Sequence, residues 1–116
     1  MIRQFYGDSE RDFDLSKLDL VHELERKTGA GIGALFRRVI AGQFHVADIA
    51  ETIRLALIGG GTAPQEADAL VKAYLTNPSL APSHVLAVSI LDRLYSGPAE
   101  DEAAPGESET DSRNKA

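Results

Sequence analysis

The sequence contains no cysteine, which excludes disulfide bonds and thiolate metal sites. Long apolar runs are also missing, because the run Leu55–Ile58 is far shorter than the roughly 18 residues that a membrane-spanning helix needs. The N-terminal segment MIRQFYGDSERDF has no apolar stretch typical of a signal peptide. These absences predict a soluble protein of the cytoplasm with no membrane partner.

A surplus of positive charge is missing as well. The 116 residues carry a formal charge of −6, and residues 98–116 hold six acids against two bases. The remaining residues are nearly balanced, with twelve acids and ten bases. A chain of this kind lacks the positive field that supplies most non-specific affinity for nucleic acid, so we expect no nucleic-acid partner.

The apolar residues that are present predict a helix at the centre of the fold. In the stretch VADIAETIRLALIGGGTAP, residues 46–64, apolar side chains recur at helical spacing, and near the end they surround the helix almost completely. A helix of this kind is expected to have neighbours on several sides. The three glycines Gly59–Gly61 then end it, because glycine favours conformations outside the helix.

Four more helices and a hairpin are predicted around this segment. Residues 3–15 alternate around the turn residues Gly7-Asp8-Ser9, and we expect this hairpin to pack on the helices through Phe13 and Leu15. The expected helices run from Ser16 to Gly29, from Gly33 to Ala41, from Thr62 to about Asn77, and from Pro82 or Ser83 to Ser96. Ser16 with Asp19, and Thr62 with Gln65, have the spacing of capping boxes.

The predicted fold is therefore mainly α: a small bundle of about five helices with a short N-terminal β-hairpin. From Pro98 onward the chain has no Val, Ile, Leu, Met or aromatic residue, so it cannot offset the entropy of ordering. We expect one helical domain over residues 1–97 and a disordered acidic tail over residues 98–116.

Glycine-rich segments resemble nucleotide-binding loops but lack the necessary context. Gly29–Leu35 has the spacing G-x-G-x-G after a charged helix, whereas the dinucleotide fingerprint needs a preceding buried strand and another spacing. The glycines at 59–61 precede a helix, but no Gly-Lys-Ser/Thr follows them. We interpret both segments as helix connections, and no cofactor is predicted.

No catalytic or metal-binding constellation is apparent. His22, His45 and His84 lie far apart in the sequence and are expected at helix ends or on the surface. Arg37 and Arg38, expected to point to water, precede a turn and a helix that carries Asp48 and Glu51, and these acids argue against a DNA-reading helix. We therefore expect neither an enzyme nor a metal protein.

Some apolar side chains lie off the main core stripes of their helices. A five-helix domain can bury them all; otherwise they form a surface for another chain. The candidate partner-binding residues are Phe44, Leu55, Ile58, Leu75 and Leu80.

Several segments together resemble a known family. Leu20–Glu25, Gly33–Arg38, Ala41–Phe44, Glu51–Gly61 and Pro64–Ala67 are similar in order and content to the gene transfer agent family of tail assembly proteins. The resemblance covers about residues 5–95. Such proteins are encoded in phage-like particle clusters of alphaproteobacteria and are classed with tail assembly chaperones, earlier also described as tail tube related.

The resemblance implies a non-enzymatic chaperone, without cofactor, that binds the tape measure protein during tail morphogenesis, with the tail tube protein as a further partner. It implies a place in the bacterial cytoplasm or on the virion, and it leaves homo-oligomers open. The alternatives are a structural component of the tail tube or tail end and, less favoured by the charge, a DNA-associated regulator. The family has no assigned site residues to carry over.

Overall fold

The computed structural model describes residues 1–98 and begins with an antiparallel hairpin. Strand β1 (Ile2–Tyr6) pairs with strand β2 (Ser9–Phe13) in a register that places Ile2 opposite Phe13 and Tyr6 opposite Ser9. Gly7 has a positive φ of 74° in the tight turn, a conformation that glycine adopts without a steric penalty. The hairpin expected over residues 3–15 is therefore confirmed.

Five helices follow, and the predicted fold class is confirmed. Most of the expected acidic tail lies outside the described residues. The helices are α1 (Leu18–Thr28), α2 (Ile32–Ile40), α3 (Val46–Gly59), α4 (Pro64–Tyr74) and α5 (Ala81–Ser96).

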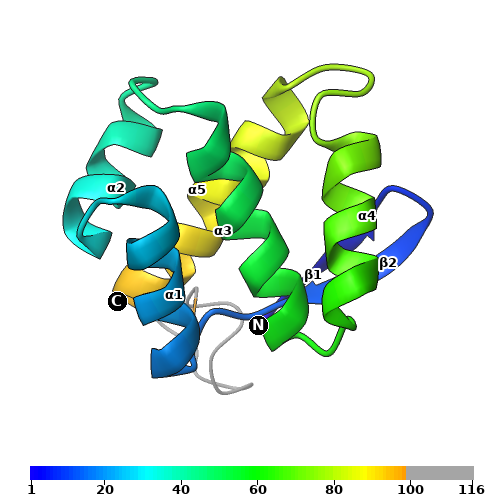
Figure 1. The fold of residues 1–116 in the computed structure, drawn as a ribbon, viewed down its shortest axis with the longest axis horizontal. Helices are drawn as coiled ribbons and strands as arrows, with labels where there is room; N and C mark the ends of the chain where they lie inside the picture. The colour runs from blue at the N-terminus through cyan, green and yellow to red at the C-terminus, as the bar shows by residue number, and fades with distance from the viewer. Residues whose placement is uncertain (99–116) are drawn as a thin grey trace, which may run out of the picture.

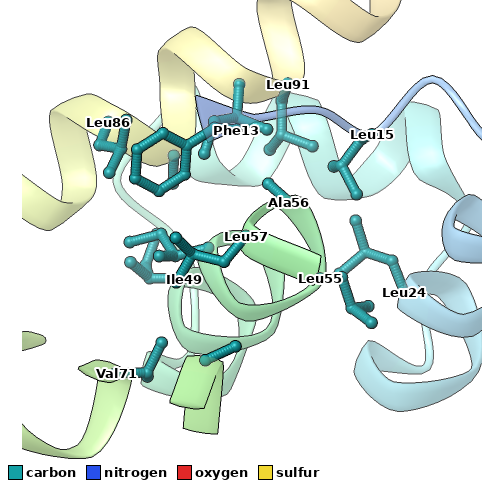
Figure 2. Packing of buried hydrophobic residues seen from close by; sticks show 14 of the residues in the cluster. Phe13, Leu15, Leu24, Ile49, Leu55, Ala56, Leu57, Val71, Leu86 and Leu91 are labelled. Carbon is teal, nitrogen blue, oxygen red and sulfur yellow. The ribbon is translucent and has the colours of Figure 1, made fainter. Parts of the chain in front are cut away.

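Helix α3 is the centre of the domain, as its apolar composition predicts. It contacts β2 and each of the other four helices, with α1 and α2 on one side, α4 and the hairpin on the other, and α5 behind it (Figure 1). Ile49 and Ile53 are fully buried along its length. Figure 2 shows Leu55, Ala56 and Leu57 pointing to different parts of the surrounding core, which is the arrangement expected of a helix that is apolar nearly all round.

The hairpin is held tightly against the C-terminal end of α3. Phe13 and Leu15 are buried in the core, as expected, and the backbone N–H of Asp14 donates to the carbonyl oxygen of Ala56 over 2.9 Å. A Cβ atom on Gly59 would overlap the carbonyl oxygen of Asp14. The glycines that end α3 therefore also allow the chain before α1 to approach the helix backbone.

A second link ties the hairpin to α4. Arg11 of β2 donates to Glu66 over 2.7 Å and to Asp8 in the turn over 3.2 Å. The hydrogen bond from Arg11 lowers the pKa of the Asp8 carboxyl. Because Asp8 and Glu66 are largely exposed, we assign these ion pairs a role in orientation and little stability.

The two predicted capping boxes are wrong. The N-cap residues of α1 and α4 are Lys17 and Ala63, one position after Ser16 and Thr62, and neither helix start has a side-chain cap. Pro64 occupies the first turn of α4, where its missing N–H costs nothing.

Candidate interaction surface

The ionisable side chains of the described domain include no candidate metal site. Within residues 1–98, no three His, Asp or Glu side chains meet in an arrangement that could hold a metal ion. His45 precedes α3, while the ring of His84 makes a 2.7 Å hydrogen bond with the carbonyl oxygen of Val39 and lies 4.6 Å from the ring of Phe44. These contacts give His84 a packing role between α2 and α5.

One partly buried ion pair joins three helices, and it corrects the expectation that Arg38 points to water. The Arg38 guanidinium donates two hydrogen bonds of 2.8 Å to the carboxylate of Asp48, which is only 1% exposed. It also donates to the carbonyl oxygen of Thr28 at the end of α1 over 3.4 Å. Asp48 in turn accepts from the backbone N–H of His45, at the start of α3. The pair therefore locks α2 against α1 and α3.

The predicted partner-binding residues do not come together on one exposed surface. Leu55 and Leu75 are buried within the core, and Phe44, Ile58 and Leu80 are partly buried against it. The domain thus uses all five in its own packing. Their contact with a partner stays a prediction.

An open apolar surface lies elsewhere, in a groove between α1, α2 and α5. The groove has a volume of about 320 Å³ and is open to solvent. Leu18 at the start of α1 is 67% exposed, and Tyr95 at the end of α5 is 74% exposed. The groove is lined by Ser16, Leu18, Val21, Ile32, Phe36, Leu91, Leu94 and Tyr95. We call it the α1–α2–α5 groove.

Local contacts hold the parts of this groove in place. The carboxylate of Glu25 on α1 accepts from the backbone N–H of Ile32 over 2.8 Å, so α1 caps the start of α2. The ring of Phe36 lies 5.6 Å from the ring of Tyr95, which joins α2 to α5. The groove is therefore preformed.

The edge of the groove before α1 is shaped by Asp14. Its carboxylate accepts from the backbone N–H of Ser16 over 2.9 Å. Burial raises the pKa of Asp14, but the hydrogen bonds from Ser16, together with the positive charges of the N-terminus and Lys17, outweigh this effect, so the net pKa is lowered. This short turn positions Ser16 and Leu18 at the groove.

Sequence reasoning missed this groove. Its candidate residues include neither Leu18 nor Tyr95. The sequence did contain one indication. Leu18 and Tyr95 both lie within one turn of a helix end, where a neighbouring helix or strand is least certain to cover a side chain. Spacing alone could not show that no segment among residues 1–98 covers them.

A second open feature runs along strand β1, which among residues 1–98 pairs with β2 alone. Phe5 is 63% exposed. A pocket of about 390 Å³ separates the second half of β1 from the α4–α5 connection, with Tyr74, Pro78 and Pro82 among its lining residues. The free edge of β1 is a more polar candidate surface than the groove, because a strand edge exposes backbone groups.

The remaining findings concern the described domain as a whole. No helix among the described residues combines the length and the apolar content needed to cross a membrane. A family model described as "Phage tail tube protein, GTA-gp10" matches residues 1–97. The chain belongs to this phage tail tube family. Searches of curated proteins and of solved structures gave no match.

Membership of the GTA-gp10 family indicates the kind of assembly in which this domain acts. The match spans the hairpin, all five helices and Gly97, so it covers nearly the whole described structure. The family is one of phage and gene transfer agent tails, and its description names a structural protein rather than a reaction. The protein therefore has a tail-related structural role, for which surfaces that contact other tail polypeptides are the relevant sites.

Proposed function

We propose that this protein acts in tail assembly of a gene transfer agent or phage-like particle by binding another tail polypeptide. The observation that carries the proposal is the family match over residues 1–97. The described domain supports it, because it has an open groove lined mainly by apolar side chains. Contiguous exposed apolar surface is typical of protein–protein contacts.

One form of this role is residence in the particle, in the tail tube or at its end. The description of the family as a tail tube protein favours this form. A resident subunit would be bound by neighbouring tail proteins at fixed stoichiometry.

The other form is a transient chaperone for the tape measure protein. Two features favour this form: the chain is acidic, with a formal charge of −6, and its open apolar groove can cover an apolar segment of another chain. A chaperone of this kind would work in the cytoplasm and leave before the particle is complete. It would limit aggregation of a long partner while the tube forms around it.

Quantitative mass spectrometry of purified particles separates the two forms. A resident component is expected at a fixed ratio to the major tail protein, whereas a chaperone is expected in lysates of producing cells and not in particles. Co-expression with each tail protein of its own gene cluster then identifies the partner by co-purification. Absence from particles together with co-purification of no tail protein would contradict both forms.

A further inference from the structure

The α1–α2–α5 groove is apolar on every side. Its polar side-chain groups are the hydroxyls of Ser16 and Tyr95, and the other lining residues are aliphatic or Phe. Leu18 and Tyr95 keep 67% and 74% of their surface exposed at two of its walls. Large apolar side chains left in water on a preformed concave surface favour an occupant that removes them from water.

The chain beyond the described residues cannot supply this occupant. Helix α5 ends at Ser96, one residue after Tyr95, and residues 99–116 follow it in the sequence. Those residues, however, contain no Val, Ile, Leu, Met or aromatic side chain and carry six acids. An acidic segment without large apolar side chains gains little from an apolar groove.

A second copy of the chain is also a poor occupant. Within residues 1–98 the other exposed large apolar side chains are Ile40, Val46 and Val85, one each on α2, α3 and α5, together with Met1 and Phe5 at the hairpin. None of these helices presents a second apolar stripe that could enter the groove. A two-fold contact that placed groove against groove would join eight lining residues from each copy, far fewer than the about 20–30 per partner of a stable interface.

The backbone of the occupant decides between a strand and a helix. An extended segment in this groove would bury its own N–H and C=O groups beside aliphatic side chains, without hydrogen-bond partners. A helix satisfies these groups internally and presents apolar side chains at i, i+3, i+4 and i+7 to a groove. The three helices that form the groove also offer ridges between which such side chains can pack.

We propose that the α1–α2–α5 groove binds one amphipathic α-helix of another polypeptide, through an apolar stripe of the partner helix. The proposal rests on the proposed function only for where the partner is found, among the tail proteins. It assigns Leu18 and Tyr95 as the two side chains that lose the most exposed surface on binding.

Two designed peptides test the occupant. The first is a labelled 15-residue peptide with leucines at helical spacing, and the second has the same composition with leucines at every other position. Titrated with the full 116-residue protein and followed by fluorescence anisotropy, the helical peptide is expected to bind at least tenfold more tightly. Equal or tighter binding of the alternating peptide would overturn the proposal.

Single substitutions in the protein test whether the peptide binds in the α1–α2–α5 groove. Leu18→Ser and Tyr95→Ser are each expected to weaken binding of the helical peptide about tenfold, since each removes one large contact. Val85→Ser is the matched control, because Val85 lies on α5 and is 64% exposed but does not line the groove. Its affinity should stay within about twofold of the parent. Loss with Val85→Ser, or no loss with the two groove variants, would contradict the assignment.

The other occupants have their own readouts. A synthetic peptide of residues 99–116 should not displace the helical peptide, and sedimentation should show no dimer that Tyr95→Ser dissociates. Displacement by the peptide of residues 99–116, or a dimer that Tyr95→Ser dissociates, would overturn the choice of occupant. If the Tyr95→Ser variant still co-purifies with its tail partner as the parent protein does, the assignment of the groove as the binding site is wrong and the proposed function stands. If the parent co-purifies with no tail protein while the peptide results hold, the groove stands and the proposed function fails.

Discussion

Helix α3 lies between two sides of the domain that are packed in opposite ways. On the hairpin side, the backbone before α1 approaches the end of α3 so closely that Gly59 has no room for a methyl group. On the side of the α1–α2–α5 groove, Leu18 and Tyr95 remain mostly in water although the groove around them is preformed. The difference teaches that the same core can pack one side closely enough to exclude a methyl group and leave the other available for another chain.

Substitutions should therefore affect stability on the hairpin side and binding on the groove side. Core packing and close backbone contacts determine the free energy of unfolding, whereas exposed apolar side chains contribute little to it. The following predictions test this division, beginning with the largest expected effect.

Gly59→Ala should be the most damaging single-methyl change. The added Cβ would meet the carbonyl oxygen of Asp14 and the side chain of Leu20, so the hairpin must move away from α3. We expect a loss of about 3 kcal/mol or more in the free energy of unfolding, measured by urea denaturation.

Gly33→Ala is the control for this change. Gly33 lies in α2 with open space around its Cβ position, and alanine favours the helix. We expect a gain of about 0.5 kcal/mol. Similar losses for both variants would show that the close contact at Gly59 is not the cause.

Arg38→Ala should destabilise the packing of α2, which forms one wall of the groove, against α1 and α3. The change leaves the buried carboxylate of Asp48 without its two guanidinium hydrogen bonds and releases α2 from α1 and α3. Because Arg38 itself is partly exposed, we expect a loss of about 2–3 kcal/mol, somewhat less than for a fully buried pair.

Arg26→Ala provides the comparison for an exposed ion pair. Arg26 pairs with Glu23 one turn earlier on α1, and its side chain is 70% exposed. Its removal should change the free energy of unfolding by less than about 0.5 kcal/mol. Equal effects of the two arginine variants would argue against the locking role of Arg38.

Much of this fold is predictable from the sequence, because periodicity identifies helices and turn residues identify the hairpin. The capping of the helix starts is not, since contacts from other helices contribute to it: Glu25 of α1 binds the N–H of Ile32 at the start of α2, and Asp48 near the start of α3 is held by Arg38. Such contacts join positions that no local pattern connects.

The candidate surface was less predictable still. The pattern shows which residues are apolar, but whether a side chain is covered depends on how the helices are arranged. Leu55 and Leu75 therefore fall inside the core, while Leu18 and Tyr95 remain exposed.

Tyr6→Phe should change the pH dependence of stability on the hairpin side. Burial raises the pKa of the Tyr6 hydroxyl above its ordinary value of 10.0, while its ring packs against Phe13 and Tyr74. A raised pKa in the folded state means that stability is fully present below about pH 10 and is lost as the pH rises through the folded-state pKa. Urea denaturation at pH 8 to 11 should show this loss, and Tyr6→Phe should reduce it.

Near neutral pH, Tyr6→Phe should alter the free energy of unfolding by less than about 1 kcal/mol, because the ring and its contacts remain. Tyr95→Phe removes an exposed hydroxyl and should leave the alkaline loss unchanged. An alkaline loss that persists in full with Tyr6→Phe would assign it to another group.

Leu18→Ser should have the smallest effect on folding, and it compares the two environments within one helix. Leu18 and Leu24 both lie on α1, but Leu18 is 67% exposed and Leu24 is fully buried. Leu24→Ala should cost about 2–5 kcal/mol because it leaves a cavity. Leu18→Ser should cost less than about 0.5 kcal/mol, since its side chain is mostly in water in the folded and unfolded states alike. A large loss with Leu18→Ser would mean that the groove wall belongs to the core, and the exposed leucine would then need no partner to explain it.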